Sequence, residues 1–329
     1  MLRLKTVQYT CGAVLAAALA CGAAAQTAGS DGRLMEGQQL RALGRFAEAK
    51  AVFVSLLQDA RKNSPDNRLV AIVLDNLGID EQDSGDYAEA ETSYNNGLAA
   101  FHATVADDPV PIALKTHLAE LYIAEGRPEH AETLIRPVVA ALRSSALPDT
   151  LALALAYEDL AVSCIMQHRF QEPETLLRQS QGLVETELGP DHPRLASGLL
   201  TFAALLTAQH RYSEAVAPAE RAWKILRTSP IGIPKPYLAA AFSVMGAVLY
   251  HAGREGDAEE CARRSVELAD ASLGPKHPRL ALYLANYAVI LKHGDHKSRA
   301  KEIRKRADEI MAGYAAASGG YTVNVAALR

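Results

Sequence analysis

Small residues recur along this chain at a spacing of 41 to 43 residues. Each member of one series follows a short turn by five residues, and an aromatic residue or its substitute stands two residues after the turn. A second series of small residues lies twelve positions before the first. The first series is Ala49, Ala90, Ala131, Pro173, Ala215, Ala258 and Ala300, and the second is Gly37, Gly78, Ala119, Ala161, Ala203, Gly246 and Ala288. Seven copies in one register indicate an internal repeat.

Each repeat is predicted to be a pair of antiparallel helices. Small side chains allow two helices to cross closely, and glycine suits the tight turn between them. Abundant alanine and an aromatic content of only 6% also favour helix. One pair cannot bury its apolar face alone, so neighbouring pairs must stack. The sequence therefore predicts an all-α fold, an α-solenoid of about seven antiparallel helix pairs over residues 33–312.

The repeat resembles the tetratricopeptide repeat. The resemblance rests on Asn76-Leu77-Gly78 followed by Gly85-Asp86-Tyr87-Ala88-Glu89-Ala90, and on Leu118-Ala119-Glu120-Leu121-Tyr122 followed by Gly126 and Ala131. Residues 188–196 and 273–281 are nearly identical Leu-Gly-Pro-x-His-Pro-Arg-Leu-Ala connections. They resemble the kinesin-light-chain subclass, whose repeats also run near 42 residues. The departures from the family pattern are His168, His210, Pro173, Glu255 and Lys297. The resemblance implies a right-handed superhelix that binds other polypeptides.

In the family, the first helices of the pairs line a concave groove that holds peptides. Residues three before, and one and four after, the Gly37 series are therefore expected to point inward. With Asp83 near the rim, the predicted groove residues are Asp75, Ile79, Gln82, Thr116, Glu120, Ile123, Glu158, Val162, Ile165, Leu200, Thr207, Ser243, Ala247, Tyr250, Val289 and Lys292. Carboxylates gather in the N-terminal half, and the C-terminal half is small and apolar. This groove fits a peptide that is basic at one end and apolar at the other, although the acids could equally serve only to keep the groove soluble.

The first 25 residues have the features of an export signal. Arg3 and Lys5 precede an uncharged stretch of small apolar residues that ends near a small-x-small cleavage site. The sequence predicts a signal peptide at 1–25, a linker at 26–32, and a mature protein that is periplasmic or secreted, without a transmembrane segment. Ala18-Leu19-Ala20-Cys21 also resembles a lipoprotein box. Lipidation of Cys21 and anchoring to the envelope is therefore the alternative.

Charge narrows the choice of partner. The chain has 34 Lys+Arg and 38 Asp+Glu, and loss of residues 1–25 makes it slightly more acidic. This balance argues against general nucleic-acid binding. Basic residues gather at Lys292 and over residues 297–306, near the C-terminus. That stretch fits either a solvated capping helix or a peripheral contact with an anionic membrane, glycan or partner.

The sequence contains no recognised catalytic, cofactor or metal motif. His192 and His277 occupy equivalent connections and are interpreted as turn residues. Two cysteines, Cys164 and Cys261, lie two repeats apart, so we interpret both as packed apolar side chains. The predicted function is a non-catalytic protein–protein interaction scaffold that needs no cofactor.

Two other functions remain alternatives. The first is a lipid-anchored subunit of a bacterial envelope or secretion complex, which lipidation of Cys21 would support. The second is a hydrolase that uses groove residues such as His117, Glu120 and Glu158, although an open groove excludes water poorly. The last segment, 313–329, is predicted to be a flexible tail.

Overall fold

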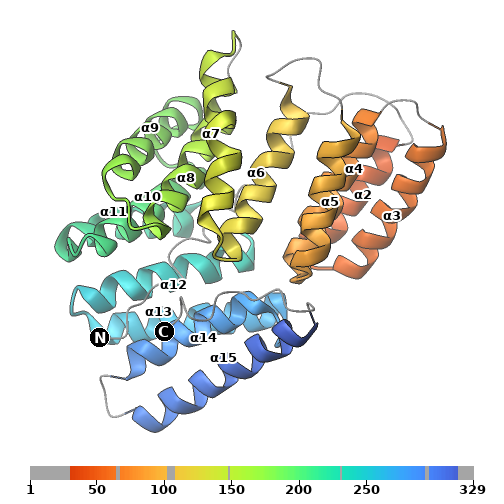
Figure 1. Cartoon of the computed structure of the whole chain (residues 1–329). Helices are drawn as coiled ribbons and strands as arrows, with labels where there is room; N and C mark the ends of the chain where they lie inside the picture. The colour runs from red at the N-terminus through yellow and green to blue at the C-terminus, as the bar shows by residue number, and fades with distance from the viewer. Residues whose placement is uncertain are drawn as a thin grey trace.

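The protein consists of paired helices wherever the computed structural model describes the chain, at residues 30–63, 67–101, 108–146, 149–229, 232–292 and 296–317. Fourteen helices in these residues form consecutive antiparallel pairs (Figure 1). The pairs are α2 (Ser30–Ala42) with α3 (Phe46–Asn63), α4 (Asn67–Ser84) with α5 (Tyr87–Ala100), α6 (Pro109–Ala124) with α7 (Pro128–Ser144), α8 (Thr150–Met166) with α9 (Gln171–Leu188), α10 (Arg194–Ala208) with α11 (Tyr212–Thr228), α12 (Lys235–His251) with α13 (Glu255–Leu273), and α14 (Pro278–Leu291) with α15 (Lys297–Ala317). The predicted all-α solenoid of seven pairs is confirmed.

The helical array is longer at both ends than predicted. α2 begins at Ser30, inside the expected linker, and α15 continues through Gly313 to Ala317. Residues 313–317 are therefore helical and do not belong to a flexible tail. The predicted signal peptide with Cys21, and residues 318–329 of the expected tail, lie outside the described residues.

Small residues stand where the two helices of a pair cross. A Cβ atom added to Gly78 would lie 2.6 Å from the ring of Tyr94, and one added to Gly37 would lie 2.4 Å from Phe53. Both rings are fully buried against these glycines. The close crossings explain the residue series from which the repeat was predicted.

Six of the turns between paired helices share a left-handed residue. Their φ angles lie between 59° and 88°, at Gly44, Gly85, Gly126, His168, His210 and Gly253. The two histidines adopt the same conformation as the glycines, although a Cβ atom makes it unfavourable. The turns therefore occur at the positions predicted from the sequence, even where histidine stands in place of glycine. The histidine backbone is strained at these two positions.

Replacing His168 by glycine should raise stability. The exposed His168 holds φ at 59°, a conformation that costs a non-glycine residue about 1–2 kcal/mol. The greater freedom of glycine in the unfolded chain offsets part of this gain. His168→Gly should therefore raise the free energy of unfolding by about 0.5–1 kcal/mol, measured by urea denaturation. His168→Ala keeps a Cβ atom and should give no gain, so equal gains from both variants would contradict the strain explanation.

At four junctions, an arginine side chain that follows the turn joins a repeat to the one before it. In four repeats the arginine directly after the turn forms an ion pair with a carboxylate about 34 to 37 residues earlier, in the preceding second helix. The pairs are Arg127–Glu91, Arg169–Glu132, Arg211–Glu174 and Arg254–Glu220. These contacts fix the stacking of successive pairs, and the sequence analysis did not anticipate them.

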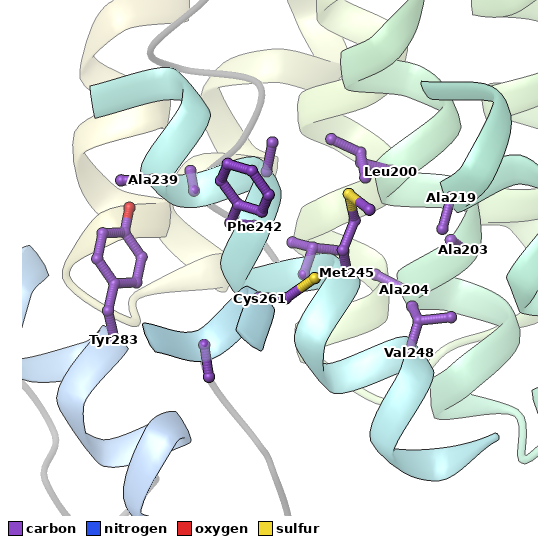
Figure 2. Packing of buried hydrophobic residues seen from close by; sticks show 14 of the residues in the cluster. Leu200, Ala203, Ala204, Ala219, Ala239, Phe242, Met245, Val248, Cys261 and Tyr283 are labelled. Carbon is purple, nitrogen blue, oxygen red and sulfur yellow. The ribbon is translucent and has the colours of Figure 1, made fainter. Parts of the chain in front are cut away.

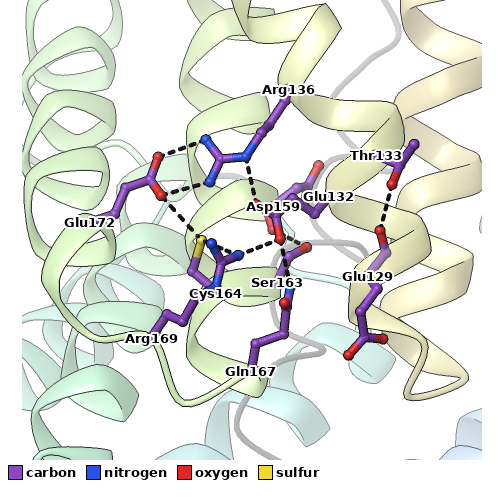
Figure 3. A network of polar contacts seen from close by, with 10 residues as sticks. All are labelled: Glu129, Glu132, Thr133, Arg136, Asp159, Ser163, Cys164, Gln167, Arg169 and Glu172. Carbon is purple, nitrogen blue, oxygen red and sulfur yellow. Dashed lines mark hydrogen bonds and ion pairs between the residues drawn. The ribbon is translucent and has the colours of Figure 1, made fainter.

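The contacts of Glu132 show how such a junction is arranged (Figure 3). The Glu132 carboxylate accepts hydrogen bonds from Arg136 at 2.6 Å, from Gln167 at 2.7 Å and from Arg169. Arg136 continues across the junction to Glu172 at 2.7 Å. Burial alone would raise the pKa of Glu132, but these donors outweigh it and lower the pKa to about 2. Glu132 is therefore charged at neutral pH and ties α7 to α8 and α9.

Apolar side chains form a nearly continuous core along the array. The largest cluster extends from α8 to α15 and includes Tyr237 and Tyr283, both almost fully buried. Figure 2 shows part of it, where Phe242 and Met245 of α12 lie between Leu200 of α10 and Cys261 of α13. Many of its members are alanines, which keep neighbouring helices close. Both described cysteines are buried and unpaired, as predicted.

The array also bends back on itself, so that its last pair meets its second pair. In Figure 1 the ends of α14 and α15 lie beside the lower end of α5. His277 Nε2 is 3.1 Å from the carbonyl oxygen of Asp83, and the ring of Tyr314 lies edge-on to Tyr87 with 5.6 Å between centroids. These contacts join residues that are about 190 to 230 positions apart in the sequence. The concave side of the superhelix is therefore closed.

Candidate functional site

Most of the predicted groove residues are buried inside the closed superhelix. Those with less than a tenth of their surface exposed are Ile79, Gln82, Thr116, Glu120, Ile123, Glu158, Val162, Ile165, Leu200, Thr207, Ser243 and Ala247. Asp75, Asp83, Tyr250 and Val289 are half-buried, and Lys292 is exposed. The expectation that these positions form an open surface is therefore wrong for the buried set, because the array closes over them. Their part in binding stays a prediction.

Two of the predicted groove carboxylates, Asp75 and Glu158, are paired with other side chains of the protein. Asp75 Oδ1 lies 2.7 Å from His117 Nδ1. Glu158 accepts hydrogen bonds from Ser180 and Ser197, each at 2.8 Å. His117, the histidine named in the hydrolase alternative, is therefore paired with Asp75. Glu120 and Glu158 are 3% and 2% exposed, so solvent hardly reaches either carboxylate in the closed array.

Two buried arginines come from the duplicated His-Pro-Arg connections. Arg194 begins α10, and Arg279 is the second residue of α14. Their side chains are 8% and 2% exposed respectively. Arg279 Nη1 lies 3.7 Å from Asp83 Oδ1, and Arg194 Nη2 donates to the carbonyl oxygen of Leu151 at 3.4 Å. The duplicated connection thus places a guanidinium twice in the interior of the superhelix.

Carboxylates outnumber these guanidiniums in the interior. Burial raises the pKa of Glu120 well above its usual value, the nearby carboxylate of Asp159 adds to the shift, and Arg194 and Arg279 oppose it. Burial likewise raises the pKa of Asp159, with Glu158 adding to it and Arg194 opposing it. Glu120 Oε1 and Asp159 Oδ2 have no hydrogen-bond partner within the described ranges. With Asp83 and Glu158, four carboxyl groups lie near these two guanidiniums, and burial raises the pKa of each of the four.

His277 has a defined role at this closure. Its Nδ1 accepts a hydrogen bond from the backbone N–H of Arg279 at 3.1 Å, which caps the N-terminus of α14. Its Nε2 lies 3.1 Å from the carbonyl oxygen of Asp83 and therefore carries the proton. Burial and the charge of Arg279 lower the pKa of His277 to about 3. His192 Nδ1 accepts a similar hydrogen bond from the N–H of Arg194, at 3.2 Å, although the N-cap residue of α10 is Pro193. Both histidines are turn residues, as interpreted from the sequence.

A concave feature of the described surface lies between α11, α12 and α13. It is a cleft with a volume of about 270 Å³. Trp223 of α11 packs against Phe242 of α12 with 4.8 Å between ring centroids, and Met245 and Cys261 also line the cleft. Large aromatic side chains and methionine are typical of the apolar centres of protein interfaces. The cleft therefore has the composition of a docking site for an apolar side chain.

Charged residues surround the mouth of this cleft. Glu220 of α11 receives a hydrogen bond from Arg254 at 2.7 Å, which spans the cleft, and Arg254 also contacts Asp257. Arg264 donates to Glu260 at 2.6 Å and lies over the ring of Phe242. Three carboxylates and two guanidiniums line the cleft. Arg263 also pairs with Glu260, at 2.7 Å, so the charges at the mouth are balanced around an apolar floor.

The sequence contained a signal for this cleft. Trp223 is the single tryptophan of the chain and stands eight residues after Ala215. The equivalent residues of the other repeats are Leu57, Leu98, Val139, Gln181, Val266 and Asp308. A large aromatic side chain at a position where smaller residues are usual marks a difference among repeats. The width of the cleft, however, depends on how α11 and α12 pack, which repeat periodicity does not report.

Other candidate sites receive little support from the described residues. None of the His, Cys, Asp and Glu side chains in the described ranges gather in threes as metal ligands. None of the described helices is long and apolar enough to cross a membrane. The basic stretch of α15 is partly neutralised, because Arg304 pairs with Asp308, Lys305 with Glu309, and Arg306 with Asp270.

The stacked pairs and their shared turn register define the protein as a helical-repeat solenoid. The sequence profile of the tetratricopeptide repeat matches residues 35–102, 154–228 and 237–318, more than half of the chain. The chain belongs to the tetratricopeptide repeat family.

This chain is similar to several solved structures at low sequence identity. BtubC (BKLC) from P. vanneervenii is 20% identical, covering 76% of this chain and 94% of that one, with a TM-score of 0.50. A kinesin-light-chain repeat structure from Podosopora anserina is 21% identical over 62% of this chain and 97% of that one, with a TM-score of 0.44. Yeast Tom70 is 14% identical over 95% of this chain and 69% of that one, with a TM-score of 0.51. A search of curated proteins gave no match.

Proposed function

We propose that this protein is a non-catalytic scaffold that recognises a protein partner through the cleft between α11, α12 and α13. Tetratricopeptide repeats typically mediate protein–protein interaction, and the observation that supports this site is the apolar cleft beside Trp223. A tryptophan in a partly enclosed pocket is the kind of residue that dominates binding energy at interfaces. The proposed ligand is a short amphipathic segment of a partner protein.

The shape of the cleft defines that segment further. A volume of about 270 Å³ over Phe242 and Met245 suits one or two bulky apolar side chains. If residues 1–25 direct export, the partner is periplasmic or extracellular. Lipidation of Cys21 would instead place both proteins at the envelope.

Trp223→Ala should weaken partner binding by about thirtyfold, which corresponds to a central interface residue. The measurement compares capture from envelope extract by wild type, Trp223→Ala and Val266→Ala, followed by titration of the captured protein. Val266 occupies the same repeat position in α13 and does not line the cleft, so its variant should bind like wild type.

Because Trp223 is the only tryptophan, its fluorescence reports directly on the cleft. Binding should shift its emission to the blue and protect it from acrylamide. A partner that all three proteins bind equally, without change in this emission, would place recognition outside the cleft.

A further inference from the structure

The outer face of α2 is exposed at positions that are buried in every later repeat. The first helix of each later pair packs against the second helix of the pair before it. At the position of Gln39, two residues after the Gly37 series, the later repeats carry buried residues, which are Asp80, Leu121, Ser163, Leu205, Val248 and Ile290. The same holds at the position of Met35, two residues before that series, from Asn76 to Asn286. In α2 both positions are exposed, because no described pair precedes it.

Large apolar side chains stand on this exposed face. Met35 and Leu43 are 56% and 72% exposed, and with Val54 of α3 they are the exposed large apolar residues of the described chain. Met35, Gln39 and Leu43 are spaced four residues apart, so they form one stripe along the turns at the end of α2. Terminal repeats of a solenoid normally carry a polar outer face. Apolar residues at both ends of this stripe therefore indicate a contact surface.

Arg45 extends the same argument to charge. It stands directly after the first turn, which is the position from which Arg127, Arg169, Arg211 and Arg254 bind a carboxylate of the preceding second helix. No such helix precedes Arg45 in the described chain, and its guanidinium is half exposed and pairs with Glu48 of α3 at 2.6 Å. The first pair thus presents the apolar and the charged elements of a repeat junction without the repeat that would complete it.

The last pair of a second copy cannot complete this junction by stacking head to tail. The four acceptor carboxylates follow the small residue of their second helix by one position or, for Glu220, by five. In α15 these two positions hold Lys301 and Lys305. Both lysines would repel Arg45 instead of accepting hydrogen bonds from it. Head-to-tail stacking, which builds open filaments, is therefore disfavoured.

We propose that this face is the interface of a two-fold homodimer, in which α2 packs antiparallel against α2 of a second copy. With Gln39 on the two-fold axis, Met35 of each copy faces Leu43 of the other, because both lie four residues from Gln39. The same pairing brings Arg45 beside the first turns of the other α2, which carry Asp31 and Glu36.

The apolar and the charged residues of this face are thus both self-complementary, as a two-fold interface requires. The antiparallel arrangement also continues the stacking of the array, in which each first helix packs against an antiparallel neighbour. The interface does not involve the Trp223 cleft, so either proposal can fail without the other.

Cysteine cross-linking tests the two-fold axis. Side chains that meet where two helices cross lie close enough for a disulfide, so Gln39→Cys should form a covalent dimer under mild oxidation. Gln58→Cys places the same change at an exposed position of α3 and should cross-link no more than wild type does. Equal cross-linking of these three proteins would overturn the two-fold arrangement.

Sedimentation equilibrium of the purified protein from about 1 to about 100 µM measures the association itself. Leu43→Glu and Met35→Glu should each weaken dimerisation at least about a hundredfold, because each variant places two carboxylates in the interface. Val54→Glu adds the same charge to an exposed apolar position of α3 and should associate like wild type. All three side chains are exposed in the single chain, so circular dichroism should show equal helix content.

Two outcomes of this measurement would overturn the proposal. A dimer that survives both α2 variants would place the interface elsewhere. A wild type that stays monomeric at every concentration would leave the α2 face to residues 1–29 or to a different protein.

Discussion

Gly78→Ala should destabilise the protein, although alanine is the better helix former. The added Cβ atom would lie 2.6 Å from the ring of Tyr94, closer than real Cβ contacts allow. Tyr94 is fully buried, and its hydroxyl donates to Gln82 at 3.1 Å, so the ring cannot move aside freely. We expect a loss of about 1–3 kcal/mol in the free energy of unfolding, as for overpacked cores. Urea denaturation followed by circular dichroism measures it.

Gly182→Ala is the matched control for this loss. Gly182 lies in the middle of α9, and a Cβ atom there would meet nothing within 4 Å. The variant should gain about 0.5–1 kcal/mol from helix propensity. In a Tyr94→Leu background, Gly78→Ala should also become stabilising, because the obstructing ring is gone. A destabilising effect that persists in that background would show that the crossing of α4 and α5 is not limited by Tyr94.

This crossing also shows why the fold could be predicted from the sequence. Gly78 and Ala90 belong to series that recur every 41 to 43 residues, and Gly37, Gly78 and Gly246 each lie against the second helix of their own pair. Contacts within a helix pair recur in every repeat, so the periodic pattern of the sequence reveals them. The turn register behaved similarly, since His168 and His210 took the left-handed conformation of the glycines they replace.

The interior could not be predicted in the same way. Whether Glu120 faces an open groove or a buried cluster depends on the contact between Asp83 and His277, which are 194 residues apart. The two His-Pro-Arg connections illustrate this. His192 is partly exposed and His277 is 4% exposed, although their sequences are nearly identical. Only the curvature accumulated over five repeats distinguishes them, and no local pattern encodes that curvature. The cleft beside Trp223 could not be predicted either, because its width depends on the spacing of α11, α12 and α13.

Asp80→Asn should stabilise the protein strongly above neutral pH and hardly at all in acid. Asp80 of α4 is fully buried, and neither carboxyl oxygen has a hydrogen-bond partner among the described residues. Burial raises the pKa of Asp80 to about 7, from an ordinary value of 3.8. Between pH 3.8 and about pH 7, Asp80 is protonated in the folded protein but ionised in the unfolded chain. Stability contributed by the neutral group is therefore complete below about pH 4 and is lost as the pH rises through 7.

The size of the effect follows from that difference in pKa. Each unit corresponds to about 1.4 kcal/mol, so a shift of about three units predicts a gain of about 4 kcal/mol for Asp80→Asn at pH 8. Asparagine resembles the protonated acid in shape and charge, which is why the gain should vanish near pH 4.

The measurement is the free energy of unfolding of wild type and variant in urea at intervals from pH 4 to pH 9. Asp191→Asn removes an exposed carboxylate from the connection between α9 and α10 and should change stability little at any pH. If the gain for Asp80→Asn is the same at pH 4 and pH 8, then Asp80 has the same pKa in the folded and the unfolded chain, and the prediction is wrong. A loss at pH 8 would mean that the carboxylate is held by a favourable contact, so that its burial does not control the titration.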